Sequence, residues 1–195
     1  MKVQPYTNFD NDIDEIQLYT SVFKFHFDAL FNYGKKITND SELVKDCIQE
    51  LFFRIWKNKV DLKAISYIKS YLLKGLRRQI LNVLELKCNN VDKIKLEDNF
   101  LIEFSHEDYL IQMQNEDGLK NKVIHALNQL TKKQREAVYL RYFEDLEYTE
   151  IAEVMNINLQ SVKNNVHRGI QSLRDIITIL SLLGYASIET LIRFK

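Results

Sequence analysis

Five polar side chains recur at helical spacing near the C-terminal end of the chain. No Asp or Glu occurs from 158 to 173, the stretch in which they stand. Amide, ammonium, imidazole and guanidinium groups donate hydrogen bonds to phosphate oxygens and to base edges in the DNA major groove. The pattern therefore predicts binding of duplex DNA rather than catalysis. The five residues are Gln160, Lys163, Asn164, His167 and Arg168.

Two predicted helices joined by a tight turn would position these side chains. Asn156 stands where the chain must reverse, and Asn tolerates the left-handed backbone that such a turn needs. Thr149 and Asn158 are predicted N-caps of the two helices. The pattern is typical of a helix-turn-helix, whose second helix can lie in the major groove; a plain helical hairpin in a bundle is the alternative. The apolar residues at helical spacing are Ile151, Ala152, Met155, Leu159, Val162, Val166, Ile170 and Leu173.

The segments on either side of this hairpin also show helical patterns. A helical domain is expected to begin near Leu119. Thr131 and Gln134 fit a capping box for a helix from Lys132 to Phe143. That helix is expected to bury Ala137, Val138 and Tyr142. After Asp175 we expect the second helix to continue, to break at Gly184 and to be followed by a short amphipathic helix, which either pads the domain or docks a partner.

Composition and charge predict an all-α protein with two small helical domains. Five Gly and one Pro leave little for the many turns of an all-β fold. The net charge of zero hides an uneven distribution: residues 57–87 hold eight cations against two acids, and residues 88–118 hold two against eight. We therefore expect domains at 1–87 and 119–195, joined by an acidic linker at 88–118.

The N-terminal domain is expected to begin with an aromatic-rich helix from about Ile13 to Ile37, whose apolar residues would pack in the core. Asp40 then caps a second helix, Ser41 to about Lys57, in which two adjacent apolar rows form one buried face. The expected core residues of the first helix are Ile16, Tyr19, Val22, Phe23, Phe27, Leu30, Phe31 and Tyr33. Those of the second are Leu43, Cys47, Leu51, Ile55, Val44, Ile48, Phe52 and Trp56.

The opposite face of the second helix is polar except for one large aromatic residue, Phe53. An aromatic residue on a polar face suggests contact with a partner protein. A lone exposed aromatic residue, or burial under another segment, is the alternative. The polar residues of that face are Glu42, Asp46, Gln49, Glu50 and Lys57.

A third predicted helix, about Tyr67 to Leu86, follows the loop at 58–66. Its non-apolar faces interleave cations with aromatic and amide groups, a combination that suits a nucleic-acid backbone and unpaired bases. A solvated basic helix is the alternative. The candidate contacts are Tyr67, Tyr71, Lys74, Arg77, Arg78 and Asn82.

The sequence gives no sign of an enzyme, a metal site or a cofactor. Its four histidines are scattered, and no glycine-rich phosphate loop or nucleophile motif is present. Cys47 and Cys88 make no disulfide framework, which fits a reducing cytoplasm. No signal peptide and no apolar run of membrane-spanning length occurs.

Two separated stretches resemble the extracytoplasmic-function group of bacterial sigma factors. SELVKDCIQELFFRIWKNK, from Ser41 to Lys59, is similar to the polymerase-binding segment of that group, with Asp46, Gln49, Phe52 and Trp56 at the family's spacing. ALNQLTKKQREAVYLRYFEDLEYTEIA, which opens the stretch from 127 to 174, resembles the region-four domain. Both occur in the family order on either side of the acidic segment.

The resemblance implies a role for each candidate surface. Asp46, Gln49, Glu50 and Phe53 would bind the clamp helices of core RNA polymerase, while Phe52 and Trp56 would belong to the core. The loop at 58–66 and the third helix would recognise and melt the minus-ten element. The helix with Lys163, Asn164, His167 and Arg168 would read the minus-thirty-five element.

Within the third helix, Asn82 matches a polar position near the melted strand, whereas Arg78 stands where many members have Asn. The group also implies an inhibitory anti-sigma partner, of a kind that can be membrane-anchored. The alternatives are a free-standing helix-turn-helix regulator that binds DNA as a dimer, and a polymerase-binding interaction module. The first predicts a palindromic site and leaves the helix at 41–57 without a task.

Overall fold

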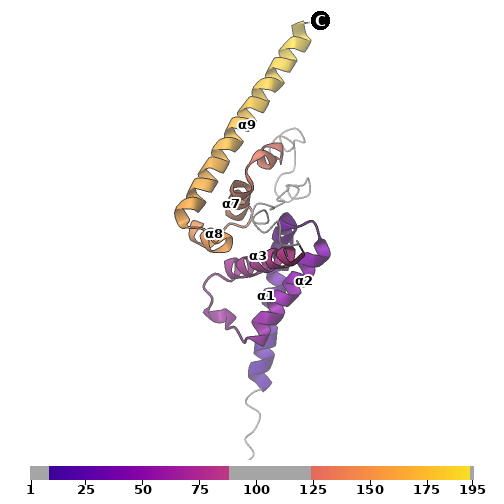
Figure 1. Ribbon diagram of the computed structural model, residues 1–195, viewed down its shortest axis with the longest axis vertical. Helices are drawn as coiled ribbons and strands as arrows, with labels where there is room; N and C mark the ends of the chain where they lie inside the picture. Colours follow the sequence, from indigo (N-terminus) through magenta and orange to yellow (C-terminus); the bar gives the residue numbers. More distant parts are fainter. Residues whose placement is uncertain (1–8, 88–123, 194–195) are drawn as a thin grey trace, which may run out of the picture. The chain divides into compact units, whose positions relative to one another are not determined.

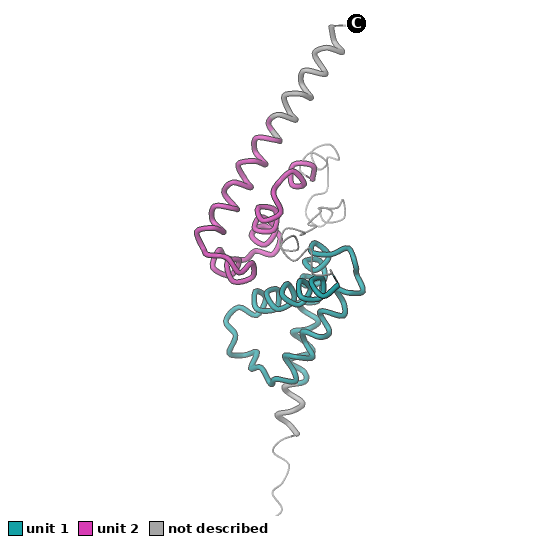
Figure 2. The backbone as a smooth tube through the Cα atoms, viewed as in Figure 1, with its two compact units in different colours: residues 1–87 teal, residues 88–195 magenta. Residues whose placement is uncertain are grey.

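The structure, a computed structural model, describes residues 9–87 and 124–193 (Figure 1). The described residues form helices and connecting turns without a strand, so the predicted all-α class is confirmed. The chain divides into two compact units, residues 1–87 and 88–195 (Figure 2). The expected linker at 88–118 lies outside the described residues. Among the described helices, none has the length and apolar content needed to cross a bilayer.

Three helices that pack against one another in all pairs form the first unit. They are α1 (Phe9–Ile37), α2 (Ser41–Lys57) and α3 (Ile68–Lys87). The predicted bounds of α2 are confirmed, and those of α3 differ by one residue at each end. The Asp40 carboxylate accepts a hydrogen bond from the backbone N–H of Leu43 at 3.0 Å, which makes it the expected N-cap of α2.

The wide apolar face of α2 is buried, with one exception at its end. Seven of the eight residues predicted to be core are buried, but Trp56 is 43% exposed. It lies in the last turn of α2 and packs edge-on against Tyr19 of α1, with ring centroids 5.1 Å apart. The seven buried residues stand in the turns before Trp56, and α2 as a whole packs against both α1 and α3. Ile16, near the start of α1, was also predicted to be core and is half exposed.

A close approach between α1 and α2 depends on Gly34. A Cβ atom at this position would lie 2.5 Å from Cγ1 of Val44, which is fully buried.

The loop after α2 contains the short 3-10 helix η1 (Leu62–Ala64), whose Leu62 side chain is buried. The Tyr19 hydroxyl donates to the carbonyl of Val60 in the same loop. The loop at 58–66 is thus fixed to α1 by this hydrogen bond and to the first unit by the buried Leu62 side chain.

The described part of the second unit contains α7 (Lys132–Tyr142), α8 (Tyr148–Met155) and α9 (Leu159–Arg193), which also contact one another in all pairs. A helical turn at 124–129 precedes them. The Arg135 guanidinium donates to the carbonyls of Asn128 and Leu130, both at 2.9 Å, and so ties this turn to α7. The predicted capping box of Thr131 and Gln134 is present at the start of α7.

The buried stripe of α7 differs from the prediction at one residue. Ala137 and Val138 are buried as expected, but Tyr142 is 55% exposed and Tyr139 is buried in its place. The Tyr139 hydroxyl donates to the buried carboxylate of Glu144 at 2.9 Å, so its polar tip has a partner. In the last turn of α7, Tyr142 keeps its ring largely in solvent.

The start of α8 lies two residues before the one predicted. Its N-cap is Glu147 rather than Thr149, because the Glu150 carboxylate accepts a hydrogen bond from the Glu147 backbone N–H at 2.8 Å. The side chain of Glu147 also pairs with Arg141 of α7 at 3.1 Å. Thr149 is therefore the second residue of the helix, and its hydroxyl does not cap it.

The turn between α8 and α9 has the predicted geometry. Asn156 adopts the left-handed conformation, with φ 54° and ψ 46°, and the next backbone N–H donates to the carbonyl of Ala152 at 3.1 Å. The Asn158 side chain accepts a hydrogen bond from the N–H of Ser161 at 2.7 Å, which confirms it as the cap of α9. The sequence pattern thus located the turn correctly.

The long helix α9 continues without the break expected at Gly184. A single glycine costs about 1 kcal/mol relative to Ala but keeps its backbone N–H, and no proline follows to remove a donor. Nearer its start, Val162 and Val166 are buried, whereas Leu159 is exposed. Gly169 allows a close approach to α7, since a Cβ atom there would lie 2.8 Å from Cγ2 of Val138.

Candidate nucleic-acid and protein interfaces

All five polar residues predicted to contact duplex DNA lie exposed on α9. The buried side of the same turns, formed by Val162, Val166 and Gly169, fixes the orientation of the helix against α7 and α8. The Gln160 side chain donates to the Asn164 side-chain oxygen at 3.0 Å. This pair orders the first exposed turn, and the first turn of α9 holds no acidic residue. The exposed residues are Gln160, Lys163, Asn164, His167 and Arg168.

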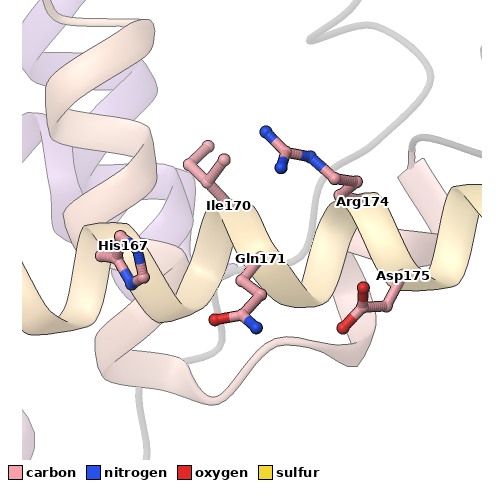
Figure 3. A pocket seen from close by; sticks show the side chains of 5 residues that line it. All are labelled: His167, Ile170, Gln171, Arg174 and Asp175. Atoms are coloured by element: carbon pink, nitrogen blue, oxygen red, sulfur yellow. The ribbon is translucent and has the colours of Figure 1, made fainter.

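The polar row of α9 extends farther than predicted. Gln171 and Arg174 are exposed and follow His167 at helical spacing. Figure 3 shows them with Asp175 around a hollow along α9, beside Ile170. The sequence signal was available, because Gln171 stands four residues after His167, but the candidate set ended at Arg168. The hollow combines one cation with one carboxylate, so its charge is less positive than that of the preceding turns.

The residues predicted to bind polymerase form one exposed surface on α2. Asp46, Gln49 and Glu50 are exposed, and Phe53 is 57% exposed. Glu50 lies 3.8 Å from Arg54, whose guanidinium also contacts Gln79 of α3. A shallow hollow beside this surface adds three further charges, the carboxylates of Asp40 and Glu42 and the ammonium of Lys87. The surface as a whole is acidic and includes one large aromatic side chain.

Phe53 also lines an aromatic groove between α1 and α2. The groove contains two edge-on ring pairs, Tyr19 with Trp56 and Phe23 with Phe52, whose centroids are 5.1 and 5.0 Å apart. The exposure of Trp56 opens this groove to solvent. Sequence reasoning missed it because it assigned Trp56 to the core. By contrast Cys47 is buried, and burial raises the pKa of its thiol, which makes it an unreactive core residue.

Five of the six candidate contacts on α3 and in the turn just before it are exposed and fall on one row. The sixth, Arg77, stands beside this row and is half-buried. Tyr67 is 64% exposed and Tyr71 is 38% exposed, so both rings can be reached by a base. The buried side of α3 is apolar and contacts both α1 and α2. The row consists of Tyr67, Tyr71, Lys74, Arg78 and Asn82.

The described residues lack the groupings that metal chemistry would need. Throughout residues 9–87 and 124–193, no three His, Cys, Asp or Glu side chains gather in a geometry that could hold an ion. Apart from the buried Lys36, Glu136 and Glu144, most charged groups of the described residues lie on exposed or half-exposed surfaces. Such surfaces bind phosphates, bases and other proteins.

Comparisons with known proteins agree with this arrangement. The family model described as Sigma-70, region 4 matches residues 120–173. The RNA polymerase sigma factor SigV of Bacillus subtilis is 29% identical over 130 residues, which cover 66% of this chain and 72% of SigV. The ECF RNA polymerase sigma factor SigE of Mycolicibacterium smegmatis is 25% identical over 160 residues, 77% of this chain and 58% of SigE.

A solved structure has a similar fold. It is the sigma factor RpoE of Bartonella quintana in complex with the anti-sigma factor NepR, with a TM-score of 0.54 and 18% identity. The likeness covers 85% of this chain and 98% of that one. The helix-turn-helix lies within the matched region-four segment, and both sequence relatives are sigma factors. The chain is therefore similar to bacterial RNA polymerase sigma factors, including members of their extracytoplasmic-function group.

Proposed function

We propose that the chain is an alternative sigma factor that binds core RNA polymerase and directs promoter-specific initiation of transcription. The observation that carries this proposal is the pairing of two unlike helix faces in one chain. An acidic face with an exposed aromatic residue lies on α2, and an acid-free polar face lies on the second helix of a helix-turn-helix. The first suits a basic protein surface, and the second suits duplex DNA.

Each surface has its own task in this proposal. Asp46, Gln49, Glu50 and Phe53 bind the polymerase. The start of α9 reads the minus-thirty-five element as duplex, with Asn164 placed to contact adenine. The loop at 58–66 and the exposed row of α3 capture unpaired bases of the minus-ten element. Base capture shifts the melting equilibrium and needs no catalytic group.

The two DNA-binding surfaces gain from being joined. The exposed row near the start of α9 contains two cations, Lys163 and Arg168, and so neutralises few DNA phosphates. This row alone is therefore expected to bind duplex DNA weakly. Attachment of both units to one polymerase raises the effective concentration of each at the promoter. The proposed role thus places the chain with the polymerase in the cytoplasm, and the bound polymerase supplies the affinity.

A direct test uses the full chain, core polymerase and a library of promoter fragments. Mapped transcript starts should share two sequence elements at fixed spacing, and omission of the chain should abolish them. Matched reactions with the chain alone test for duplex binding to a palindromic site, the result expected of a free-standing regulator. Transcripts without a shared upstream element would contradict the proposal.

An anti-sigma protein is the expected inhibitory partner. The Bartonella RpoE structure is a complex with the anti-sigma factor NepR, and a sigma factor of this group is expected to be controlled in a similar way. The aromatic groove of Tyr19, Phe23, Phe52, Phe53 and Trp56 offers apolar area beside the polymerase-binding surface. A partner seated there would compete with the polymerase for Phe53.

A further inference from the structure

Leu159, the first residue of α9, is an apolar residue that the helix-turn-helix leaves 38% exposed. The next apolar residues of the predicted stripe, Val162 and Val166, are buried, so Leu159 departs from the pattern of its own helix. A single exposed apolar residue is ordinary on a protein surface. The position of Leu159 beside the proposed DNA-reading row is what makes it a candidate for a function.

Leu159 adjoins the exposed polar row of α9. Gln160 follows it directly, and Lys163 stands one helical turn farther on, at the i+4 position that shares its side of the helix. Asn164 completes this first exposed turn and accepts a hydrogen bond from Gln160 at 3.0 Å. On its exposed side Leu159 therefore neighbours amide and ammonium groups, and no carboxylate occurs from 158 to 173.

An apolar side chain at this place can add one kind of information to a polar row. Amides and cations recognise the hydrogen-bond donors and acceptors of base edges, whereas the C5-methyl group of thymine is an apolar feature of the major groove. The N-terminal residues of a recognition helix contact base edges in this motif. Leu159 is thus the residue of the first turn of α9 that suits a thymine methyl group.

We propose that Leu159 recognises the methyl group of a thymine in the minus-thirty-five element. The inference rests on the proposed function and adds a specificity-determining residue to the duplex-reading face of α9. Leu159 and Asn164 are about 7.5 Å apart along the helix axis, which exceeds the ~3.4 Å between neighbouring base pairs. We therefore expect the two side chains to read different base pairs.

The test uses holoenzyme and a promoter fragment recovered from the library experiment. Each thymine of the minus-thirty-five element, on both strands, is replaced in turn by deoxyuridine, which lacks only the C5-methyl group. Competition titrations give the ratio of the two affinities. Wild-type holoenzyme should bind about 2- to 5-fold more weakly when one particular thymine is replaced, the effect of losing one buried methyl contact. Leu159→Ala and Leu159→Asn should bind both fragments equally.

Matched variants separate the methyl contact from other effects. Leu159→Met keeps an apolar side chain of similar volume and should retain the preference for thymine. Leu86→Ala removes an exposed leucine of α3 in the other unit and should also retain it. Asn164→Ala should lose discrimination at its own base pair but keep the methyl preference. Because this preference is a ratio between two fragments, a change in the fraction of folded protein does not alter it.

Two results would overturn the inference alone. In one, wild-type holoenzyme selects a minus-thirty-five element, but no thymine in that element is sensitive to loss of its methyl group. In the other, Leu159→Ala keeps the wild-type preference, which would assign the methyl contact to another side chain. Failure of the wild-type holoenzyme to select any minus-thirty-five element would instead overturn the proposed function, and the inference with it.

Discussion

The exposed faces of α2 and α9 are built from the same secondary structure but carry opposite chemistry. On α2, three exposed carboxylates, those of Glu42, Asp46 and Glu50, accompany Phe53. On α9, no carboxylate occurs before Asp175, and the exposed groups up to Arg168 are amides, an imidazole and two cations. In both helices an apolar face is buried against two neighbouring helices. The exposed face does not take part in this packing, so its charge can differ from one helix to the other.

This difference explains why the net charge of the chain is a poor guide to its partners. The total is zero because acidic and basic segments cancel. Electrostatic attraction acts over about 10 Å at physiological salt, so a partner senses the local face rather than the sum. A basic protein surface is attracted to α2, and a phosphate backbone to α9. Substitutions that exchange or remove these local charges should therefore affect one partner at a time.

The largest effect is expected from Asp46→Arg combined with Phe53→Ala. The pair reverses one charge and removes the aromatic side chain, and affinity for core polymerase should fall by at least about 100-fold. Titration of labelled chain with core polymerase measures this. Glu85→Arg reverses an exposed charge on α3 and serves as the matched control.

The same double variant should bind a minus-thirty-five duplex with wild-type affinity, because both changes lie in the other unit. A loss of both polymerase and duplex binding would indicate that the α2 face is structural. Equal losses in the double variant and in Glu85→Arg would indicate a nonspecific charge effect on polymerase binding.

Within α9, two substitutions should distinguish sequence-specific contacts with bases from contacts with the phosphate backbone. They are Asn164→Ala and Lys163→Ala. The Asn164 variant should lose about 1–3 kcal/mol on the preferred sequence and discriminate less at one base pair. The Lys163 variant should weaken binding to all sequences and lower the slope of log K against log salt by about 1. Both are measured by duplex titrations of holoenzyme at several salt concentrations.

Because Asn164 accepts a hydrogen bond from Gln160, Gln160→Ala is the control for the loss of this pair. Loss of discrimination at the same base pair in Gln160→Ala would indicate that the hydrogen-bonded pair acts as a unit, and loss at a different base pair would indicate a separate contact by Gln160.

The turn before α9 should respond to backbone conformation alone. Asn156 has a positive φ, which a β-branched residue adopts only with strain, so Asn156→Val should lower the free energy of unfolding of the second unit by about 1–3 kcal/mol. Asn156→Gly should be close to neutral.

Two probes resolve which unit is affected. The only tryptophan of the chain, Trp56, lies in the first unit, so its fluorescence reports that unit, while circular dichroism reports both. A shift of the Trp56 transition by Asn156→Val would show that the two units do not unfold independently.

The features predicted correctly from sequence depend on local chemistry. The Asp40 and Asn158 caps, the capping box of Thr131 and the turn at Asn156 each involve residues a few positions apart. The row of five exposed residues on α9 follows from helical periodicity in the same way. These patterns specify their own geometry, because the interacting groups lie within one or two helical turns.

The cap predicted at Thr149 and the break predicted at Gly184 were local predictions that proved wrong, but the other incorrect predictions concern contacts between elements. Trp56 has a core-like position in the sequence pattern, but in the last turn of α2 it packs against Tyr19 and stays 43% exposed. Tyr139 is buried in place of Tyr142 because its hydroxyl meets Glu144 beyond the helix end. Tertiary packing decides both.

The smallest predicted effect concerns pH and the first unit. Burial and Lys69 lower the pKa of His26 in the folded chain below its ordinary value of 6.5. Between these two pKa values the unfolded chain binds more protons, so the free energy of unfolding should decrease as pH falls below about 6.5 and stay level above it. Trp56 fluorescence in urea titrations from pH 7.5 to 5.5 measures the dependence.

His26→Gln should reduce this pH dependence of the Trp56 transition, whereas His167→Gln, in the other unit, should preserve it. An unchanged slope in His26→Gln would mean that another group of the first unit takes up the proton. A reduced slope would also identify the imidazole of His26 as neutral near pH 7.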